Sequence, residues 1–386
     1  MEKSNGNHGS TPDRAKERKA SLDDDKNHVT QDLQVNKAPL LYSNITLTEN
    51  PVGESIWDSY EKFRLIEEGG TGELWLVRKR HCHQHGQETK RQQLFVVKCI
   101  DKTFLFGIFT KELRNEIENL SKIDHPNVVR IYETFETREC LFLVMEYCAG
   151  GDLWTRCTTT NTTERRAARI LQQVLSAVAH CHQQKIVHRD LKMENIMFET
   201  DNKDDDSIKV IDFGYAQHYR RPRGEYTMKI DIGTTYTMSP QVIKGEYTEK
   251  CDLWSVGVIA YCLLSGNGSC PFDGEHDQDI RRKILEGKYS MKGVQWDKVT
   301  DQAKEFVAQL LEYDPDKRWA AEEALQSPWL QTQASPTGEH LDPKHKFHNS
   351  RGSGIFRQGT KVEASCSDDY CSQYTCSEIT RAASSI

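Results

Sequence analysis

The sequence predicts an α+β fold in which a β-rich N-terminal part is followed by a larger, mainly helical part. In the first part short apolar runs, for example at residues 74–77 and 94–97, alternate with polar stretches, as is typical of strands. From Glu164 onward the pattern becomes helical, and Thr163 is placed to cap the first long helix. Its apolar residues recur at helical spacing: Ile170, Val174, Leu175, Val178 and Cys181.

Both ends of the 386-residue chain differ in composition from its centre. Residues 1–55 are rich in Lys, Asp, Asn and Ser, and residues 331–386 are polar and Ser-rich, so we expect both segments to be disordered. The folded unit then covers residues 56–330. A net charge of −7 argues against general affinity for nucleic acid or anionic membranes.

The sequence also bears on the compartment. It contains no apolar run of membrane-spanning length, its N-terminus is too charged for a signal peptide, and Glu2 excludes the N-myristoylation motif. The 12 cysteines are scattered, which favours a reducing environment. We expect a cytoplasmic protein, with the nucleus as the alternative. Three cysteines near the C-terminal end share one spacing: Cys366, Cys371 and Cys376. We expect free thiols at these positions, and lipidation or redox pairing is the alternative.

Two motifs bring together the groups that phosphoryl transfer requires. Residues 188–195 read HRDLKMEN, and residues 212–214 read DFG directly after a strand-like run at 208–211. They supply a carboxylate to orient an attacking hydroxyl, a lysine to steady the transferred phosphoryl group, and an amide and a second carboxylate for metal ions. Their order and spacing make a chance match improbable.

On these motifs the chain resembles eukaryotic protein kinases of the serine/threonine type, over residues 60–330. The resemblance implies a two-lobed fold. The N-lobe would span about residues 56–147 and contain strands and one main helix, and the C-lobe would span about residues 148–330. ATP would bind between the lobes with Mg²⁺.

The resemblance also assigns roles at the catalytic centre. Asp190 would orient the acceptor hydroxyl, and Lys192 would support the transferred group. Asn195 and Asp212 would bind Mg²⁺, a hard cation that prefers oxygen ligands. Lys98, at the end of an apolar strand run, would contact the ATP phosphates.

The N-lobe carries the expected nucleotide-binding loop at residues 68–74, EGGTGEL. Gly69 and Gly72 match the second and third glycines of the family pattern, but Glu67 stands at the first. Lys98 would pair with a helix glutamate, for which Glu116 fits best, with Glu112 and Glu118 as alternatives. The resemblance places further residues around the nucleotide: Gly70, Leu74, Val96, Met145, Glu146, Cys148, Asp152 and Met197.

The activation segment, which the resemblance places at about residues 215–240, departs from the family pattern. Arg189 often pairs with a phosphate in relatives, but the usual phosphorylated position falls on Ile230. Asp231 offers a permanent negative charge instead, which predicts activity without phosphorylation of this segment. Tyr226 and Thr227 are alternative acceptors.

The end of that segment, GTTYTMSPQ at residues 233–241, contains two substitutions. Gln241 replaces a glutamate that would pair with Arg318, so either the large lobe is less stable or another acid compensates. Thr237 replaces an aromatic residue. We further expect His188 to pack near Phe213, and Asp252 to hold the catalytic loop.

Within the superfamily, the chain resembles the calcium/calmodulin-dependent and calcium-dependent protein kinases, but without EF-hands. The hinge sequence EYCAGGDL at residues 146–153 and the acidic insert at 201–206 support this resemblance. The insert lacks the central glycine and final glutamate of a calcium loop, so we interpret it as a solvated loop. A His- and Cys-rich stretch at residues 81–85 is interpreted as a surface turn, with a metal site as the alternative.

The sequence therefore predicts an ATP-dependent protein serine/threonine kinase that acts as a monomer. Its protein substrates would carry basic residues before the acceptor, selected by Glu194 and Asp152. The alternative is a pseudokinase scaffold, which Glu67 and Gln241 favour.

Overall fold

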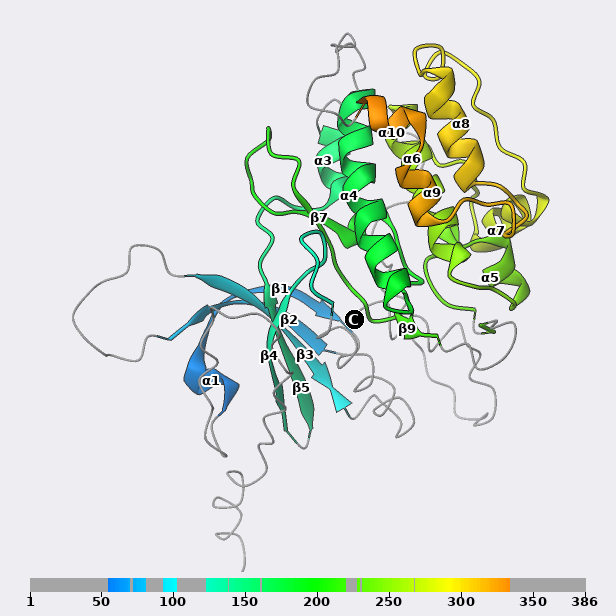
Figure 1. Ribbon diagram of the computed structural model, residues 1–386. Coiled ribbons are helices and arrows are strands. Elements are labelled where there is room, and N and C mark those ends of the chain that lie inside the picture. The colour runs from blue at the N-terminus through cyan, green and yellow to red at the C-terminus, as the bar shows by residue number, and fades with distance from the viewer. Residues whose placement is uncertain are drawn as a thin grey trace, which may run out of the picture.

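A β-sheet and a group of helices form two lobes in the computed structural model (Figure 1). The structure describes residues 55–69, 72–80, 93–102, 123–137, 139–159, 162–219, 228–229, 231–266 and 268–333. Several predictions lie outside these residues, including the disordered ends, the helix that carries Glu116, the stretch at 81–85 and the acceptors Tyr226 and Thr227.

The small lobe is built on one antiparallel sheet in the order β1-β2-β3-β5-β4. The strands are β1 (Tyr60–Gly69), β2 (Gly72–Lys79), β3 (Leu94–Asp101), β4 (Ile131–Glu136) and β5 (Cys140–Glu146). A short helix, α1 (Ile56–Ser59), precedes them and is capped by Ser55. This sheet, together with the helical large lobe, confirms the predicted α+β class.

Alternation along the strands gives the sheet two different faces. Phe95 and Val97 of β3 and Val144 of β5 are buried on one face, where they pack with aromatic residues of the small lobe. The intervening residues Val96 and Lys98 therefore point to the opposite face. That face meets the large lobe, so a lysine here reaches the space between the lobes.

The large lobe contains the remaining elements. Its helices are α3 (Leu153–Thr159), α4 (Glu164–Gln183), α5 (Pro240–Lys244), α6 (Lys250–Ser265), α7 (Asp277–Glu286), α8 (Asp301–Leu310), α9 (Ala321–Leu325) and α10 (Pro328–Gln333). Two short antiparallel pairs join β6 (Ile186–Val187) to β9 (Gln217–His218) and β7 (Ile196–Phe198) to β8 (Ile208–Val210). Thr163 caps α4 as predicted, by accepting a hydrogen bond from the Arg166 amide at 3.1 Å.

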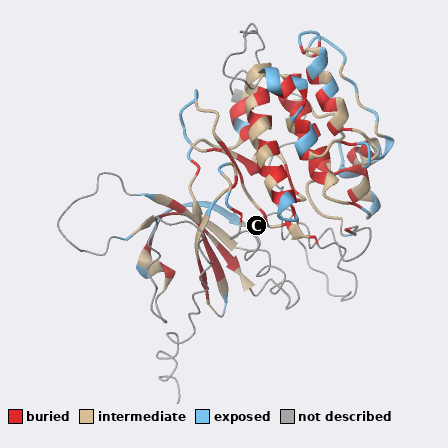
Figure 2. Cartoon of the chain, viewed as in Figure 1, coloured by how far each residue is buried: buried red, intermediate tan, exposed pale blue. Residues whose placement is uncertain are grey.

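Helix α6 forms the centre of the large lobe. All its residues from Cys251 to Ser265 are buried, and Figure 2 shows the buried surfaces of the neighbouring helices turned toward the lobe's interior. A helix that is apolar on all sides is stable only inside a core. Trp254 of α6 stacks on Phe272 with ring centroids 5.5 Å apart. No helix in the described ranges is long and apolar enough to cross a membrane.

Candidate active site

A cleft of about 700 Å³ lies between the lobes and collects most of the predicted site residues. Those that line it are Gly72, Leu74, Val96, Lys98, Met145, Glu146, Cys148, Asp152, Lys192, Asn195, Met197 and Asp212. Gly69 pairs with Gly72 at the end of β1, whereas Gly70 and Glu116 lie outside the described residues. Residues from both lobes, far apart in sequence, therefore share one cavity.

Lys98 and Asp212 meet inside this cleft. The Lys98 Nζ lies 3.2 Å from Asp212 Oδ1, so a strand of the small lobe and a loop of the large lobe are joined by an ion pair. Burial opposes ionisation of Asp212, but the adjacent Lys98 outweighs this effect and lowers the pKa of the carboxyl group. Asp212 also has a φ of 56°, in the left-handed region that few non-glycine residues adopt.

Asp190 lies next to the cleft in a network that orients both of its carboxylate oxygens. Thr234 donates to Oδ1 from its amide at 2.8 Å and from its hydroxyl at 2.7 Å. Lys192 Nζ lies 3.0 Å from Oδ2, and Asn195 Nδ2 donates to Oδ2 at 3.1 Å. Lys192 also donates to the Thr234 hydroxyl at 3.0 Å, so these four side chains form one unit.

The charge of Lys192 is maintained by this network. Burial alone would lower its pKa, but the attraction of Asp190 outweighs burial and raises the pKa above its usual value. Asp190 itself is only 1% exposed. The site therefore holds a buried carboxylate and a protonated amine in contact.

Two oxygen donors remain available for a metal ion. Asn195 uses its amide nitrogen for Asp190, and Asp212 uses Oδ1 for Lys98 and for the Gly214 amide. Asn195 Oδ1 and Asp212 Oδ2 have no partner within the described part of the chain. One amide and one carboxylate oxygen fit Mg²⁺, which is usually held by few protein ligands and by substrate phosphates. The ranges that the structure describes contain no group of three or more His, Cys, Asp or Glu residues able to hold a metal alone.

In the hinge between the lobes, the Glu146 side chain is held by Lys209 and Arg130. Lys209 Nζ lies 3.1 Å from Glu146 Oε2 and 3.2 Å from Glu199 Oε1, and Arg130 donates to Glu146 from its amide. The Glu146 side chain is thus held by an ion pair, which leaves recognition to its backbone. The Cys148 amide has no partner among the described residues and is available at the cleft. Asp152 accepts two bonds from Thr155, both 2.7 Å, and so caps α3.

Asp252 holds the backbone of the loop at residues 188–195, as predicted. Its carboxylate accepts from the amides of His188 and Arg189, both at 2.9 Å. His182 of α4 also contacts it, with Nε2 2.8 Å from Oδ2. Burial opposes ionisation of Asp252, but the His182 bond and the surrounding donors lower its pKa. Sequence reasoning missed His182, because no local motif links residues 182 and 252. His188 packs against Phe213, as predicted, with the two ring centroids 4.6 Å apart and the rings tilted by 53°.

Asp231, which could supply a negative charge in place of the missing phosphate, does not contact Arg189. Arg189 donates to the carbonyl of Tyr215 at 2.5 Å and to the Tyr247 hydroxyl at 3.4 Å. Asp231 instead makes a bidentate pair with Arg281 of α7, at 2.7 and 3.3 Å. The ion pair of Asp231 therefore holds the activation segment against α7, and not against the loop at residues 188–195. Arg281 lies 50 residues away and has no motif that would reveal it.

Arg318 is satisfied without a carboxylate. Its guanidinium donates to Gln241 Oε1 at 3.0 Å and to the carbonyls of Glu312 and Lys250, both at 2.9 Å. Gln241 Nε2 donates in turn to the Tyr313 carbonyl at 2.7 Å. Burial lowers the pKa of Arg318 to about 10. Within the described ranges no carboxylate oxygen lies within 4.0 Å of the Arg318 guanidinium, so its direct partners are Gln241 and backbone carbonyls, while the more distant carboxylates of Glu312 and Asp314 offset part of its charge.

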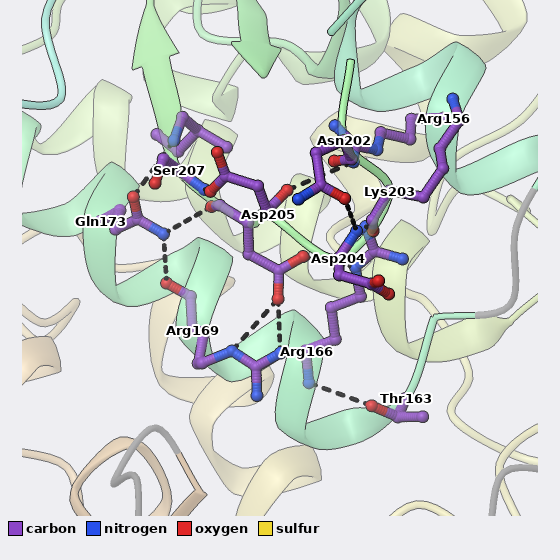
Figure 3. A network of polar contacts seen from close by, with 12 residues as sticks. Arg156, Thr163, Arg166, Arg169, Gln173, Asn202, Lys203, Asp204, Asp205 and Ser207 are labelled. Carbon is purple, nitrogen blue, oxygen red and sulfur yellow. Dashed lines mark hydrogen bonds and ion pairs between the residues drawn. The ribbon is translucent and has the colours of Figure 1, made fainter. Parts of the chain in front are cut away.

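The acidic insert is more than a solvated loop. Asp201 and Asp204 are exposed, but Asp206 is bound by two arginines of α4, Arg166 and Arg169, which Figure 3 shows beside the insert. Arg166 Nε donates to Asp206 Oδ1 at 2.7 Å, and Arg169 Nε donates to Oδ2 at 3.1 Å.

Arg156 of α3 enters the same insert and is itself only 2% exposed. It donates to the carbonyls of Thr200, Asn202 and Asp205, and its guanidinium lies 4.0 Å from the Phe198 ring centroid. The insert thus binds α3, whose first turn faces the cleft, to α4. The composition of the insert suggested solvation, because its arginine partners lie 37 to 49 residues earlier in the chain.

Comparisons with known proteins agree with this geometry. The protein kinase domain family model matches residues 60–330. Calcium-dependent protein kinase 4 of Plasmodium falciparum (isolate 3D7) is 38% identical over 290 residues, which cover 74% of this chain and 52% of that protein. Calcium-dependent protein kinase 3 of Plasmodium yoelii yoelii is 38% identical over 253 residues, or 65% of this chain and 45% of that protein.

The chain spans about half the length of the curated relatives that it matches. The family match nevertheless covers both lobes and every residue of the cleft. The chain belongs to the eukaryotic protein kinase superfamily and groups with its calcium-dependent protein kinases.

Proposed function

We propose that this chain is an ATP-dependent protein serine/threonine kinase that transfers the γ-phosphoryl group of ATP to hydroxyl groups of protein substrates. The observation that carries the proposal is the shared cleft, in which Lys98 and Asp212 lie 3.2 Å apart. A cation from the small lobe and an anion from the large lobe there would bind the two ends of one triphosphate–metal unit.

Each residue of the site has a role in this proposal. Lys98 would bind phosphate oxygens, and the Glu146 and Cys148 backbone would bind adenine. Asn195 and Asp212 would hold Mg²⁺, which neutralises phosphate charge when bound. Asp190 would orient the acceptor hydroxyl, and Lys192 would stabilise the negative charge of the transferred group.

Selectivity for serine and threonine is supported by the unit of Asp190, Lys192 and Thr234. The Thr234 hydroxyl is fixed by both partners, at 2.7 and 3.0 Å. Asp152 and Glu194 both line the cleft and would favour substrates with basic residues before the acceptor.

The alternative function is a scaffold without phosphoryl transfer. It is favoured by Glu67, because this carboxylate lines the cleft at the position of a family glycine and would repel phosphate. The intact set of Lys98, Asp190, Asn195 and Asp212 opposes it.

The test is transfer of labelled phosphate from ATP and Mg²⁺ to a generic basic peptide. We expect phosphorylation by the unaltered protein and by Asp297→Ala, an exposed control, and none by Asp212→Ala. If all three proteins are equally inert but folded, the kinase proposal is wrong and the scaffold is favoured.

A further inference from the structure

Two cysteines of the large lobe lie in contact outside the proposed active site. Cys262 is near the end of α6 and is 2% exposed, whereas Cys270 is on the following loop and is partly exposed. Their sulfur atoms are 3.5 Å apart. Of the eight cysteines that the structure describes, they are the only two whose thiols are hydrogen-bonded to each other.

The surroundings hold this pair in place. The Ser265 hydroxyl donates to the Cys262 carbonyl at 3.0 Å and lies 3.4 Å from the Ser269 carbonyl, so it joins the helix end to the loop that carries Cys270. A disulfide requires a sulfur separation of about 2.05 Å, so the two sulfurs must approach by roughly 1.5 Å. A loop residue can make such a movement more easily than a central helix.

We propose that Cys262 and Cys270 are a dithiol modification site that a peroxide converts to a reversible disulfide. Cys270, the accessible partner, attacks the peroxide as a thiolate, which breaks the O–O bond and gives a sulfenic acid with release of water or alcohol. Cys262 then attacks the sulfenic sulfur, and water leaves as the S–S bond forms. Two thiols lose two electrons and two protons, and one peroxide accepts both.

The different environments of the two thiols support this order. The hydrogen bond to Cys270 and burial raise the pKa of Cys262 well above its usual value, so Cys262 remains protonated until its partner has reacted. Reduction by a small dithiol restores the pair by exchange. A disulfide of this kind is typical of transient redox chemistry in a reducing compartment.

The position of the pair also connects it to the proposed substrate site. Tyr236 donates its hydroxyl to Glu194 at 2.6 Å, and both thiols lie close enough to contribute to its raised pKa, whose largest cause is burial. If the proposed kinase function holds, formation of the disulfide would move the residues that pack near Tyr236 and change the KM for a basic peptide. This consequence depends on the proposed function, whereas disulfide formation does not.

The experiment treats the full-length protein with graded hydrogen peroxide, blocks free thiols, and maps the cysteines by mass spectrometry after chymotrypsin digestion. Chymotrypsin cleaves after Leu263 and Leu264, so the two cysteines fall on separate peptides. We expect these peptides to become linked, to lose both free thiols together, and to separate fully after dithiothreitol treatment. In Cys262→Ala, Cys270 should instead advance to sulfinic acid, which dithiothreitol does not reverse.

Cys140 supplies the matched control, since it is partly exposed and its thiol is hydrogen-bonded to no other thiol in the described ranges. Its Cys140→Ser variant should form the Cys262–Cys270 link as the unaltered protein does. The proposal is overturned if the two thiols are lost independently, or if no linked peptide forms while Cys270 is oxidised. Because this readout needs no ATP, it remains informative even if the protein proves catalytically inert.

Discussion

Replacing Gln241 with methionine should destabilise the large lobe without touching the cleft. The variant keeps the side-chain length but removes two hydrogen bonds, one accepted from Arg318 Nη2 at 3.0 Å and one donated to the Tyr313 carbonyl at 2.7 Å. A bond to a charged donor contributes about 1.5–3 kcal/mol and a neutral one about 1 kcal/mol. We therefore expect a loss of about 3 kcal/mol in the free energy of unfolding.

The assay is urea unfolding at neutral pH, with thermal unfolding as a second measure. In a folded unit of this size, about 3 kcal/mol lowers the melting temperature by roughly 6–12 °C. Gln302→Met, an exposed change on α8, is the control and should leave stability within about 0.5 kcal/mol of the unaltered protein. If Gln241→Met is equally neutral, the carbonyl groups alone satisfy Arg318 and our reasoning is refuted.

Gln241→Glu examines the charge of Arg318 separately. Burial lowers the guanidinium pKa to about 10, which corresponds to roughly 3 kcal/mol against the folded state, present below pH 10 and relieved only as the pH rises above that value. A carboxylate would offset part of this penalty but lose the bond to Tyr313. We expect a net gain of about 1 kcal/mol at pH 7, which disappears as the pH falls below about 4 and the carboxylate is protonated.

Three further substitutions test the cleft, the network around Asp190 and the acidic insert. Gly72→Ala would place a Cβ 1.8 Å from the Cys99 carbonyl oxygen, so we expect the KM for ATP to rise by about tenfold or more in steady-state assays. Thr234→Val removes the hydroxyl bound to Asp190 and should lower kcat by about 10–100-fold while ATP affinity is unchanged by calorimetry. Asp206→Asn weakens its pairs with the two arginines of α4 and should reduce the free energy of unfolding by about 1–2 kcal/mol in urea; an unchanged midpoint would contradict the anchored insert.

The site could be predicted where short motifs fix it. The residues from 188 to 195 span one loop and one short 3₁₀ turn, so Asp190, Lys192 and Asn195 are near one another by chain connectivity. The apolar run at residues 94–97 likewise predicted the strand that ends at Lys98. Such local patterns predicted the fold class, and the family resemblance identified most residues of the cleft.

Contacts between distant surface segments could not be predicted. The Asp231–Arg281 pair depends on how the activation segment lies against α7, and either residue alone resembles an ordinary exposed charge. The hydrogen bonds from Arg156 to loop carbonyls could not be predicted either, because every residue has a backbone carbonyl and residue types therefore do not indicate which one accepts. The family pattern suggested a different partner for Asp231, and the actual packing determined the outcome.

Binding of ATP with and without Mg²⁺ tests the central claim most directly. If Lys98, Asn195 and Asp212 converge on a metal-bound triphosphate, calorimetry should show that Mg²⁺ tightens ATP binding by about tenfold or more, a gain of at least ~1.4 kcal/mol. Asp212→Asn should abolish that gain while the protein stays folded. Equal ATP affinity with and without Mg²⁺ in the unaltered protein, or an unchanged Mg²⁺ effect in Asp212→Asn, would contradict the account.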